Sequence, residues 1–266
     1  MKYFLFVFLA LNIAISPQGL SKEKNGKNEM QVGEELTYTV SYSLIKLGEI
    51  KLKILEKKQE NGKVYYKTIA HIDSYESVPF VSLHQIYESF FDQNLYSDYF
   101  RHTEKEKDYV KFTTYDFDYN KKLIKVKKGK FNKYQIWADS VAKINNKHYQ
   151  DGLSLFYFAR MNFTEPGTKT ANIFLNEKFD SASVVFHKRR EEIKIDAVDY
   201  GIDCKYLDGN ANFVGIFGLT GYFEGWFSND KYAVPILAKM KVIIGNITVE
   251  LKEWRKAQWM PPKYKR

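Results

Sequence analysis

The sequence is poor in cysteine and proline. It holds one cysteine, Cys204, and six prolines in 266 residues. A single cysteine excludes a disulfide framework within the chain, and the low proline content excludes collagen-like and proline-rich chains. Cys204 lies in residues 200–206, whose pattern is typical of a strand. We therefore expect a buried packing role for Cys204, with pairing to another chain as the alternative.

The sequence also lacks the short motifs of common catalytic sites. It contains no G-x-S-x-G, no H-E-x-x-H and no phosphate-binding loop. The histidines are scattered without metal-ligand spacing, at His71, His84, His102, His148 and His187. We therefore predict no catalytic residue, no metal site and no cofactor, and we favour a non-enzymatic role.

Long apolar runs are absent after the start of the chain, so no later segment is expected to span a bilayer. The first run, residues 3–15, follows Lys2 and is shorter than the roughly 20 residues that a spanning helix needs. Gly19 and Ser21 stand at the small −3 and −1 positions of a cleavage site. This arrangement predicts a signal peptide over residues 1–21, with an uncleaved anchor as the alternative. No cysteine follows the run, so a lipid anchor is not indicated.

Aromatic residues are abundant, at 17% of the chain, and 44% of residues are hydrophobic. This composition excludes a disordered chain and favours β-structure. Apolar and polar residues alternate over 35–42 and 49–54, and Asn61-Gly62 is typical of a two-residue hairpin turn. Short strand patterns separated by turn signals continue to residue 254. The sequence therefore predicts a mainly β protein, either an antiparallel β-barrel or a strongly curved sheet.

One segment has helical spacing, over residues 151–161. Asp151 is a good N-cap, and Leu153, Phe156 and Tyr157 fall on one helix face. We expect this helix to lie against the sheet. The predicted organisation is a disordered mature N-terminus over 22–32, one β-rich domain over 33–254, and a flexible basic tail over 255–266.

The chain is basic, with a formal net charge of +9. Lysines gather over residues 121–130, and further basic residues lie at 263–266. An exported protein rarely meets nucleic acid, so this charge favours attraction to anionic lipid or polysaccharide. The alternative is a solvated hairpin edge on which lysines prevent strand-to-strand aggregation.

Four side chains are candidates for ligand binding, namely Arg160, Tyr222, Glu224 and Trp226. Aromatic neighbours would desolvate Glu224 and raise its pKa. Tyr222, Glu224 and Trp226 alternate with Phe223 and Phe227. This pattern also fits a strand whose Glu224 points outward. Arg160 follows an aromatic helix face and would pair with an inward acid, in a structural or a catalytic role. The aromatic strands would either line a cavity or fill the core.

Several short motifs are arranged in a recognisable order over residues 33–254. They are Gly33-Glu34-Glu35-Leu36-Thr37-Tyr38, Gly48-Glu49-Ile50, Tyr87-Glu88-Ser89-Phe90-Phe91-Asp92, Asp151-Gly152-Leu153-Ser154, Trp226-Phe227-Ser228-Asn229-Asp230, Val234-Pro235-Ile236 and Gly245-Asn246-Ile247-Thr248-Val249-Glu250-Leu251. In this order they resemble the bacterial exported family catalogued as domain of unknown function 3108. The chain departs from the family at Lys231-Tyr232-Ala233, where an arginine is expected close to the proline.

The resemblance implies a β-rich envelope protein in the periplasm, or on the periplasmic face of the outer membrane, of a Gram-negative bacterium. It implies no established activity, cofactor or catalytic residue. The positions that recur in this family have expected folding roles. Gly33 and Gly48 permit turns, Asp151 and Ser154 begin the helix, Asp230 closes a hairpin, and Pro235 lies at a strand start or edge.

Three functions remain open from the sequence. The first is non-enzymatic binding of an apolar or amphipathic, lipid-like molecule in an aromatic-lined concavity. The second is an envelope interaction or assembly protein that docks through a basic face. The third is a hydrolase of envelope polymers that uses Glu224.

Overall fold

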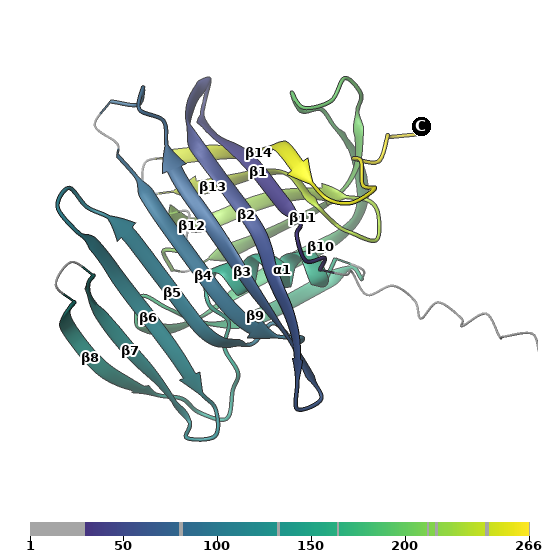
Figure 1. Cartoon of the computed structure of the whole chain (residues 1–266). Coiled ribbons are helices and arrows are strands. Elements are labelled where there is room, and N and C mark those ends of the chain that lie inside the picture. Colours follow the sequence, from purple (N-terminus) through teal and green to yellow (C-terminus); the bar gives the residue numbers. More distant parts are fainter. Residues whose placement is uncertain are drawn as a thin grey trace, which may run out of the picture.

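The computed structural model describes residues 30–79, 82–131, 134–163, 165–211, 213–215, 218–242 and 245–265. In these parts of the chain, 14 strands form one antiparallel sheet. Its order is β8-β7-β6-β5-β4-β3-β2-β1-β14-β13-β12-β11-β10-β9. The outermost strands, β8 and β9, are not neighbours, so the sheet is open (Figure 1). The predicted signal peptide over residues 1–21 lies outside the described residues.

The first half of the sheet is a meander that grows outward from β1. Asn61 and Gly62 both adopt positive φ, 50° and 76°, in the tight turn between β2 and β3, as their sequence predicts. The strands of this half are β1 (Glu35–Tyr42), β2 (Ile45–Glu60), β3 (Lys63–Ser74), β4 (His84–Asp92), β5 (Ser97–Lys105), β6 (Val110–Asp118), β7 (Leu123–Lys130) and β8 (Gln135–Lys143).

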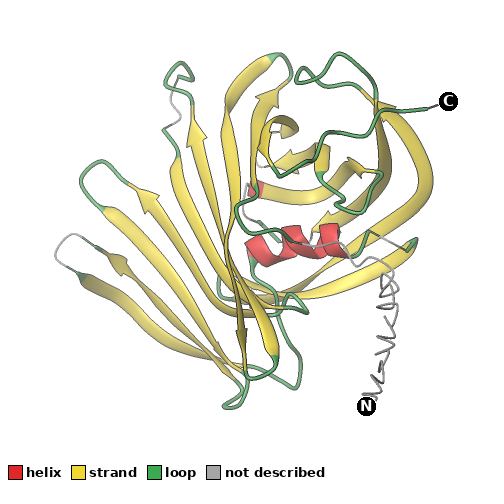
Figure 2. Ribbon diagram, turned by 45° about the vertical axis from the view of Figure 1, so that its right-hand side comes forward, coloured by secondary structure: helices red, strands yellow, loops and turns green. Residues whose placement is uncertain are grey.

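The second half follows the single described helix, α1 (Gly152–Met161). β14 pairs with β1, so both halves belong to one sheet. The sheet bends, and its second half curls around α1 (Figure 2). The predicted curved antiparallel sheet with one helix is therefore confirmed. The strands of this half are β9 (Gly167–Leu175), β10 (Lys178–Ile193), β11 (Ile202–Ala211), β12 (Leu219–Ser228), β13 (Pro235–Val242) and β14 (Gly245–Arg255).

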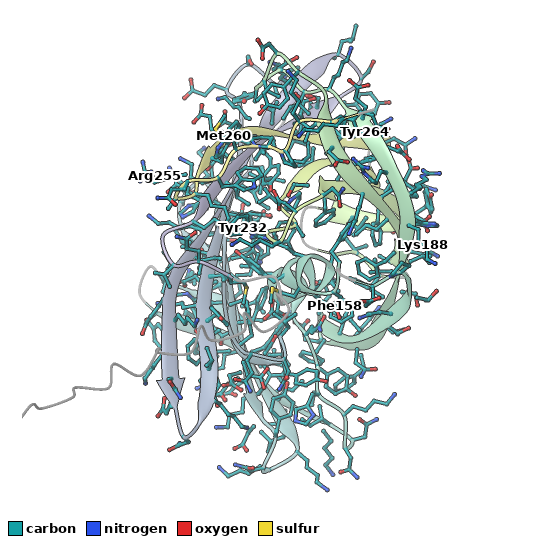
Figure 3. All side chains as sticks on the ribbon, turned by 90° about the vertical axis from the view of Figure 1, so that its right-hand side faces the viewer. Phe158, Lys188, Tyr232, Arg255, Met260 and Tyr264 are labelled. Atoms are coloured by element: carbon teal, nitrogen blue, oxygen red, sulfur yellow. The ribbon has the colours of Figure 1, made fainter. Side chains whose placement is uncertain are left out.

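The core lies on the concave side of the sheet, where α1 contacts β3, β4 and β9. An end-on view shows α1 between the two halves (Figure 3). Leu153 and Tyr157 of α1 are fully buried. The Tyr157 ring lies 5.6 Å from that of Phe91 in β4. The helix thus supplies the apolar surface that an open sheet needs against its inner face.

Asp151 attaches the start of α1 to the sheet. One carboxylate oxygen accepts hydrogen bonds from the backbone N–H groups of Leu153, at 2.7 Å, and Ser154, at 2.8 Å. The other accepts from the hydroxyls of Ser89 in β4 and Ser97 in β5. The backbone N–H of Asp151 donates to the Ser154 hydroxyl at 2.9 Å, which completes a capping box. A local helix start is therefore also a tertiary anchor.

The C-terminal segment differs from its prediction. Trp259 is buried, and its indole N–H donates to Asp230 at 2.8 Å. The backbone of Pro262 accepts from Asp203 N–H at 2.7 Å, and Tyr264 N–H donates to Gly201. The predicted flexible tail is thus wrong for residues 255–265, because apolar and hydrogen-bonding groups attach the segment to β11 and to the β12–β13 turn. At the other end, Met30 is buried within the stretch predicted to be disordered.

The glycine, aspartate and proline positions of the sequence motifs mostly have the expected folding roles. Gly33 adopts φ of 84°, which suits a turn before β1. Gly48 lies inside β2 rather than in a turn, and a Cβ there would lie 2.2 Å from the backbone oxygen of Asp73. Its role is therefore to let β3 approach closely. Pro235 is the first residue of β13, and Asp230 accepts bonds from Ser228 and from backbone N–H groups in the β12–β13 turn.

The substitution Asp151→Ala should destabilise the fold by about 3 kcal/mol. It removes the helix cap and leaves the hydroxyls of Ser89 and Ser97 without their buried acceptor. Urea unfolding followed by circular dichroism measures this loss. Asp196→Ala, at an exposed position, is the matched control and should unfold like the wild type. Equal midpoints for the three proteins would contradict the anchoring role.

Candidate functional site

An apolar cavity lies between α1 and the concave face of the sheet. Its volume is about 150 Å³. Strands β1, β2, β10, β11, β12, β13 and β14 contribute to its wall. Residues that characterise this wall are Leu155, Phe156 and Ala159 of α1, and Tyr38, Phe223 and Leu237 of the sheet. The wall is therefore built almost wholly of hydrocarbon, and it offers shape and apolar contact rather than polar recognition.

Strand alternation places the aromatic rings of β12 on the cavity side. Phe223 and Phe227 both border the cavity, with Gly225 between them. A Cβ on Gly225 would lie 2.9 Å from the Phe227 ring, and one on Gly209 of β11 would lie 2.4 Å from the Phe223 ring. These two glycines therefore make room for the rings, because any larger residue would displace them.

The side chains of Tyr222, Glu224 and Trp226 gather on the opposite, convex face of β12. The Tyr206 hydroxyl is 2.8 Å from the Glu224 carboxylate and 3.1 Å from the Tyr222 hydroxyl. Desolvation, together with these two hydrogen bonds, raises the pKa of Tyr206. The Trp226 indole N–H donates to Glu191 at 2.7 Å. Glu224 also borders the cavity, but its carboxylate is engaged on the convex side.

Glu224 has a second acid as its cross-strand neighbour. Asp208 of β11 pairs directly with Glu224, and its carboxylate is 2.8 Å from His187 Nε2. The Tyr206 ring is also covered by the guanidinium of Arg189, at 3.7 Å. Each acid therefore has a hydrogen-bonding partner within the chain, and the cluster joins β10, β11 and β12 on their outer surface.

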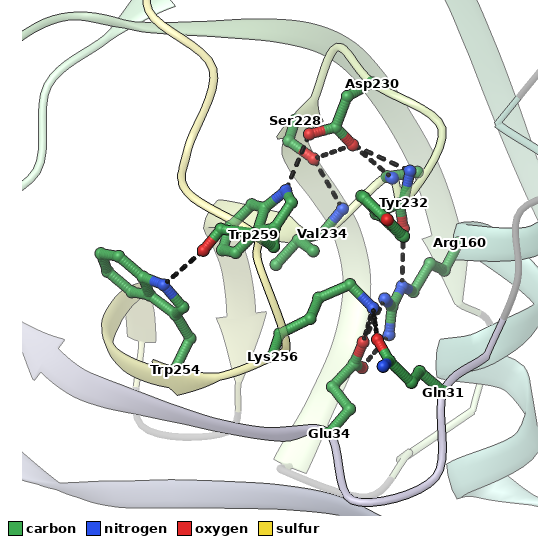
Figure 4. Close-up of polar contacts among 11 residues, drawn as sticks. Gln31, Glu34, Arg160, Ser228, Asp230, Tyr232, Val234, Trp254, Lys256 and Trp259 are labelled. Atoms are coloured by element: carbon green, nitrogen blue, oxygen red, sulfur yellow. Dashed lines mark hydrogen bonds and ion pairs between the residues drawn. The ribbon is translucent and has the colours of Figure 1, made fainter.

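Arg160 lies apart from these three residues, in a buried ion network at the end of α1 (Figure 4). Its two terminal nitrogens bind both carboxylate oxygens of Glu34, one of them at 2.8 Å. Its Nε donates to the backbone oxygen of Tyr232 at 3.0 Å. Lys256 Nζ binds the same carboxylate at 2.7 Å and lies 4.3 Å from the centre of the Tyr232 ring. The network joins α1 to the start of β1 and to the C-terminal segment.

The charges of this network are almost completely removed from water. The side chains of Arg160, Glu34 and Lys256 are exposed by 1%, 2% and 0%. Burial alone raises the pKa of Glu34, but Arg160 and Lys256 outweigh it and hold that pKa below its ordinary value of 4.5. Two cations share one carboxylate, so this end of α1 carries excess positive charge.

The network lies beside the cavity, and Tyr38 links the two. Tyr38 lines the cavity, while its hydroxyl donates to the backbone oxygen of Pro235 at 3.2 Å. Burial raises the pKa of Tyr38 well above its ordinary value, so the hydroxyl stays protonated and donating. The sequence marked Arg160 as a partner for an inward acid but missed Glu34 and Lys256. Glu34 stands in a recurrent motif, which was its only signal, and Lys256 fell in the predicted tail.

Across the described ranges, no three His, Cys, Asp or Glu side chains come together as a group that could hold a metal ion. Within the same ranges, the structure contains no helix with the length and hydrophobicity to cross a membrane.

The family model described as "Protein of unknown function (DUF3108)" matches residues 37–252. The chain belongs to this family. No curated protein matches the chain. Among solved structures, the DUF3108 chain is similar to the crystal structure of a β-barrel-like protein of domain of unknown function DUF1849 from Brucella abortus. The two share 10% sequence identity with a TM-score of 0.53, over 86% of this chain and 99% of the other. At this identity the likeness concerns the fold alone.

In this DUF3108 protein, Glu34→Gln should lower the free energy of unfolding by about 3 kcal/mol at neutral pH, because two buried cations lose their counter-charge. Since the pKa of Glu34 is depressed in the folded state, its contribution is complete above pH 4.5 and is lost as the pH falls through the folded value. The deficit of the variant should therefore shrink in acid. Urea unfolding at a series of pH values measures it.

Glu253→Gln is the matched control, because the Glu253 side chain is 69% exposed. It should behave like the wild type at every pH. A deficit of Glu34→Gln that stays constant from neutral pH into acid would contradict the proposed charge coupling.

Proposed function

We propose that this protein is exported to the bacterial envelope and binds the apolar part of a lipid-like molecule, without catalysis, in the cavity beneath α1. The observation that carries the proposal is an apolar void beside a helix attached at both ends. Asp151 holds the start of α1, and Arg160 holds its end. A helix fixed in this way cannot settle onto the sheet and fill the space.

The energetics of the void favour an occupant. An unfilled cavity costs about 24 cal/mol per Å³, so 150 Å³ corresponds to about 3–4 kcal/mol. A ligand that fills the void regains part of this loss through dispersion contacts. A protein whose only task was to be stable would gain from one larger side chain in the wall. The retained void therefore supports a binding role.

The size of the void limits the ligand. An engineered apolar cavity of about 150 Å³ stays dry and binds benzene. The corresponding occupant here is one aromatic ring, or about six carbons at the end of an acyl chain. Leu155, Phe156 and Met240 in the wall have rotatable side chains, which allow some adjustment to ligand shape. The polar part of an amphipathic ligand would stay outside, because the wall has almost no polar group to receive it.

Filling the cavity should abolish binding. Ala159→Phe places a ring in the void from α1, and we expect it to remove the fluorescence increase that N-phenyl-1-naphthylamine, an apolar dye, gives with the wild type. Ala257→Phe, at an exposed position, is the matched control and should keep that increase. Circular dichroism and thermal melting then check that both variants are folded. An unchanged dye response in Ala159→Phe would exclude the cavity as the binding site.

Export rests on the apolar run and the small residues that follow it. Expression in a Gram-negative host should yield a mature chain that begins at Lys22, because Gly19 and Ser21 suit signal peptidase. Mass spectrometry of the N-terminal peptide from a periplasmic extract measures this. Replacing Ser21 with a bulky residue should leave the precursor uncleaved. A wild-type chain that retains residues 1–21 in the cytoplasm would contradict export.

A further inference from the structure

The β7–β8 hairpin and the turn before it carry most of the net charge of the protein. Residues 121–143 contain eight lysines and one acid, Asp139, for a net charge of +7. The whole chain has a net charge of +9. β8 is the terminal strand of the sheet, and Figure 1 places it far from the half that curls around α1. The basic charge is therefore concentrated at a free edge, away from the cavity.

Large apolar side chains are exposed on the same hairpin. Trp137 is 50% exposed and Tyr134 is 65% exposed, although both are aromatic. Nearly every described residue of β8 is exposed, so this strand has no buried face. The other large exposed apolar residues of the hairpin are Phe131, Ile136 and Val141. Such a group is unusual on a surface that contacts only water.

Lysines and apolar residues alternate in space across this hairpin. Val141 of β8 is the cross-strand partner of Lys125 in β7, so the two side chains share one face. Lys127 follows Lys125 on that face, opposite Asp139. Tryptophan and tyrosine rings favour the headgroup region of a bilayer, and lysine side chains favour anionic phosphates. The hairpin combines both preferences.

Charge and strand geometry argue against pairing with a further strand. A second copy of the chain would bring the same charge of +7 to this edge. The register of β7 and β8 also shifts between Lys128 and Gly129, which interrupts the regular edge near Trp137. Bulges and lysines are the features by which edge strands resist further pairing. An anionic bilayer meets neither obstacle, because it binds charge and rings without needing a regular edge.

We propose that the β7–β8 hairpin docks on the surface of an anionic phospholipid bilayer, with lysines on the phosphates and Trp137 and Tyr134 in the headgroup layer. This inference goes beyond the proposed cavity function and does not depend on it. The hairpin holds the protein at the membrane, with the curled half displaced from that edge (Figure 1).

Vesicle binding tests the proposal. The probes are vesicles of phosphatidylcholine alone and of phosphatidylcholine mixed with phosphatidylglycerol, sedimented with the full-length mature protein. We expect binding only to the mixed vesicles, weakening as salt is raised. Each lysine near an anionic surface contributes about a fivefold gain in affinity, so Lys125→Glu with Lys127→Glu should weaken binding about 25-fold or more. Trp137→Ala should also weaken vesicle binding, and it should remove the quenching of tryptophan fluorescence by brominated lipid.

The matched control is Lys188→Glu with Lys241→Glu, an equal charge change at exposed positions on β10 and β13. It should retain most of the vesicle binding. Ala159→Phe should bind vesicles like the wild type, which separates this proposal from the cavity function. Equal losses in the two double variants, equal binding to both vesicle types, or binding to an acidic protein but not to vesicles would each overturn the docking proposal.

Discussion

Two buried carboxylates hold α1 in place, and the rest of the structure depends on them. Asp151 receives donors from β4, β5 and the first turn of the helix. Glu34 receives Arg160 from the last turn and Lys256 from the C-terminal segment. A buried carboxylate without partners is costly, so each of these positions specifies its neighbours strongly. Ten residues of helix are thereby attached to segments from both ends of the chain.

The fixed helix explains why an apolar void persists in a core that should close. Protein interiors normally reach crystal-like density by small movements of their elements. Here α1 cannot approach the concave face without breaking one of its two polar anchors. On the sheet side, Gly209 and Gly225 make room for the rings of Phe223 and Phe227, which border the cavity. The cavity is thus a consequence of polar bonds at its margins rather than of a defect in its apolar wall.

The parts of the fold that sequence revealed are those with local causes. Asn61-Gly62 and the N-cap Asp151 act within a few residues of their position, so pattern alone located them. The bond from Arg160 to Glu34 spans 126 positions and that from Lys256 to Glu34 spans 222, so no local pattern contains them. Lys256 was assigned to a flexible tail for the same reason. Alternation separated Glu224 from Phe223, but it could not say which face of β12 would be concave.

The open edge follows from the composition of β8. A strand closes a barrel only if doing so buries apolar surface or satisfies a ladder that would otherwise be exposed. β8 carries charged and polar residues on both faces, and its neighbour β7 adds four lysines. Bringing this pair against β9 would desolvate several lysines. The sheet therefore ends in an exposed basic hairpin, and the same residues that prevent closure leave that edge available to an anionic partner.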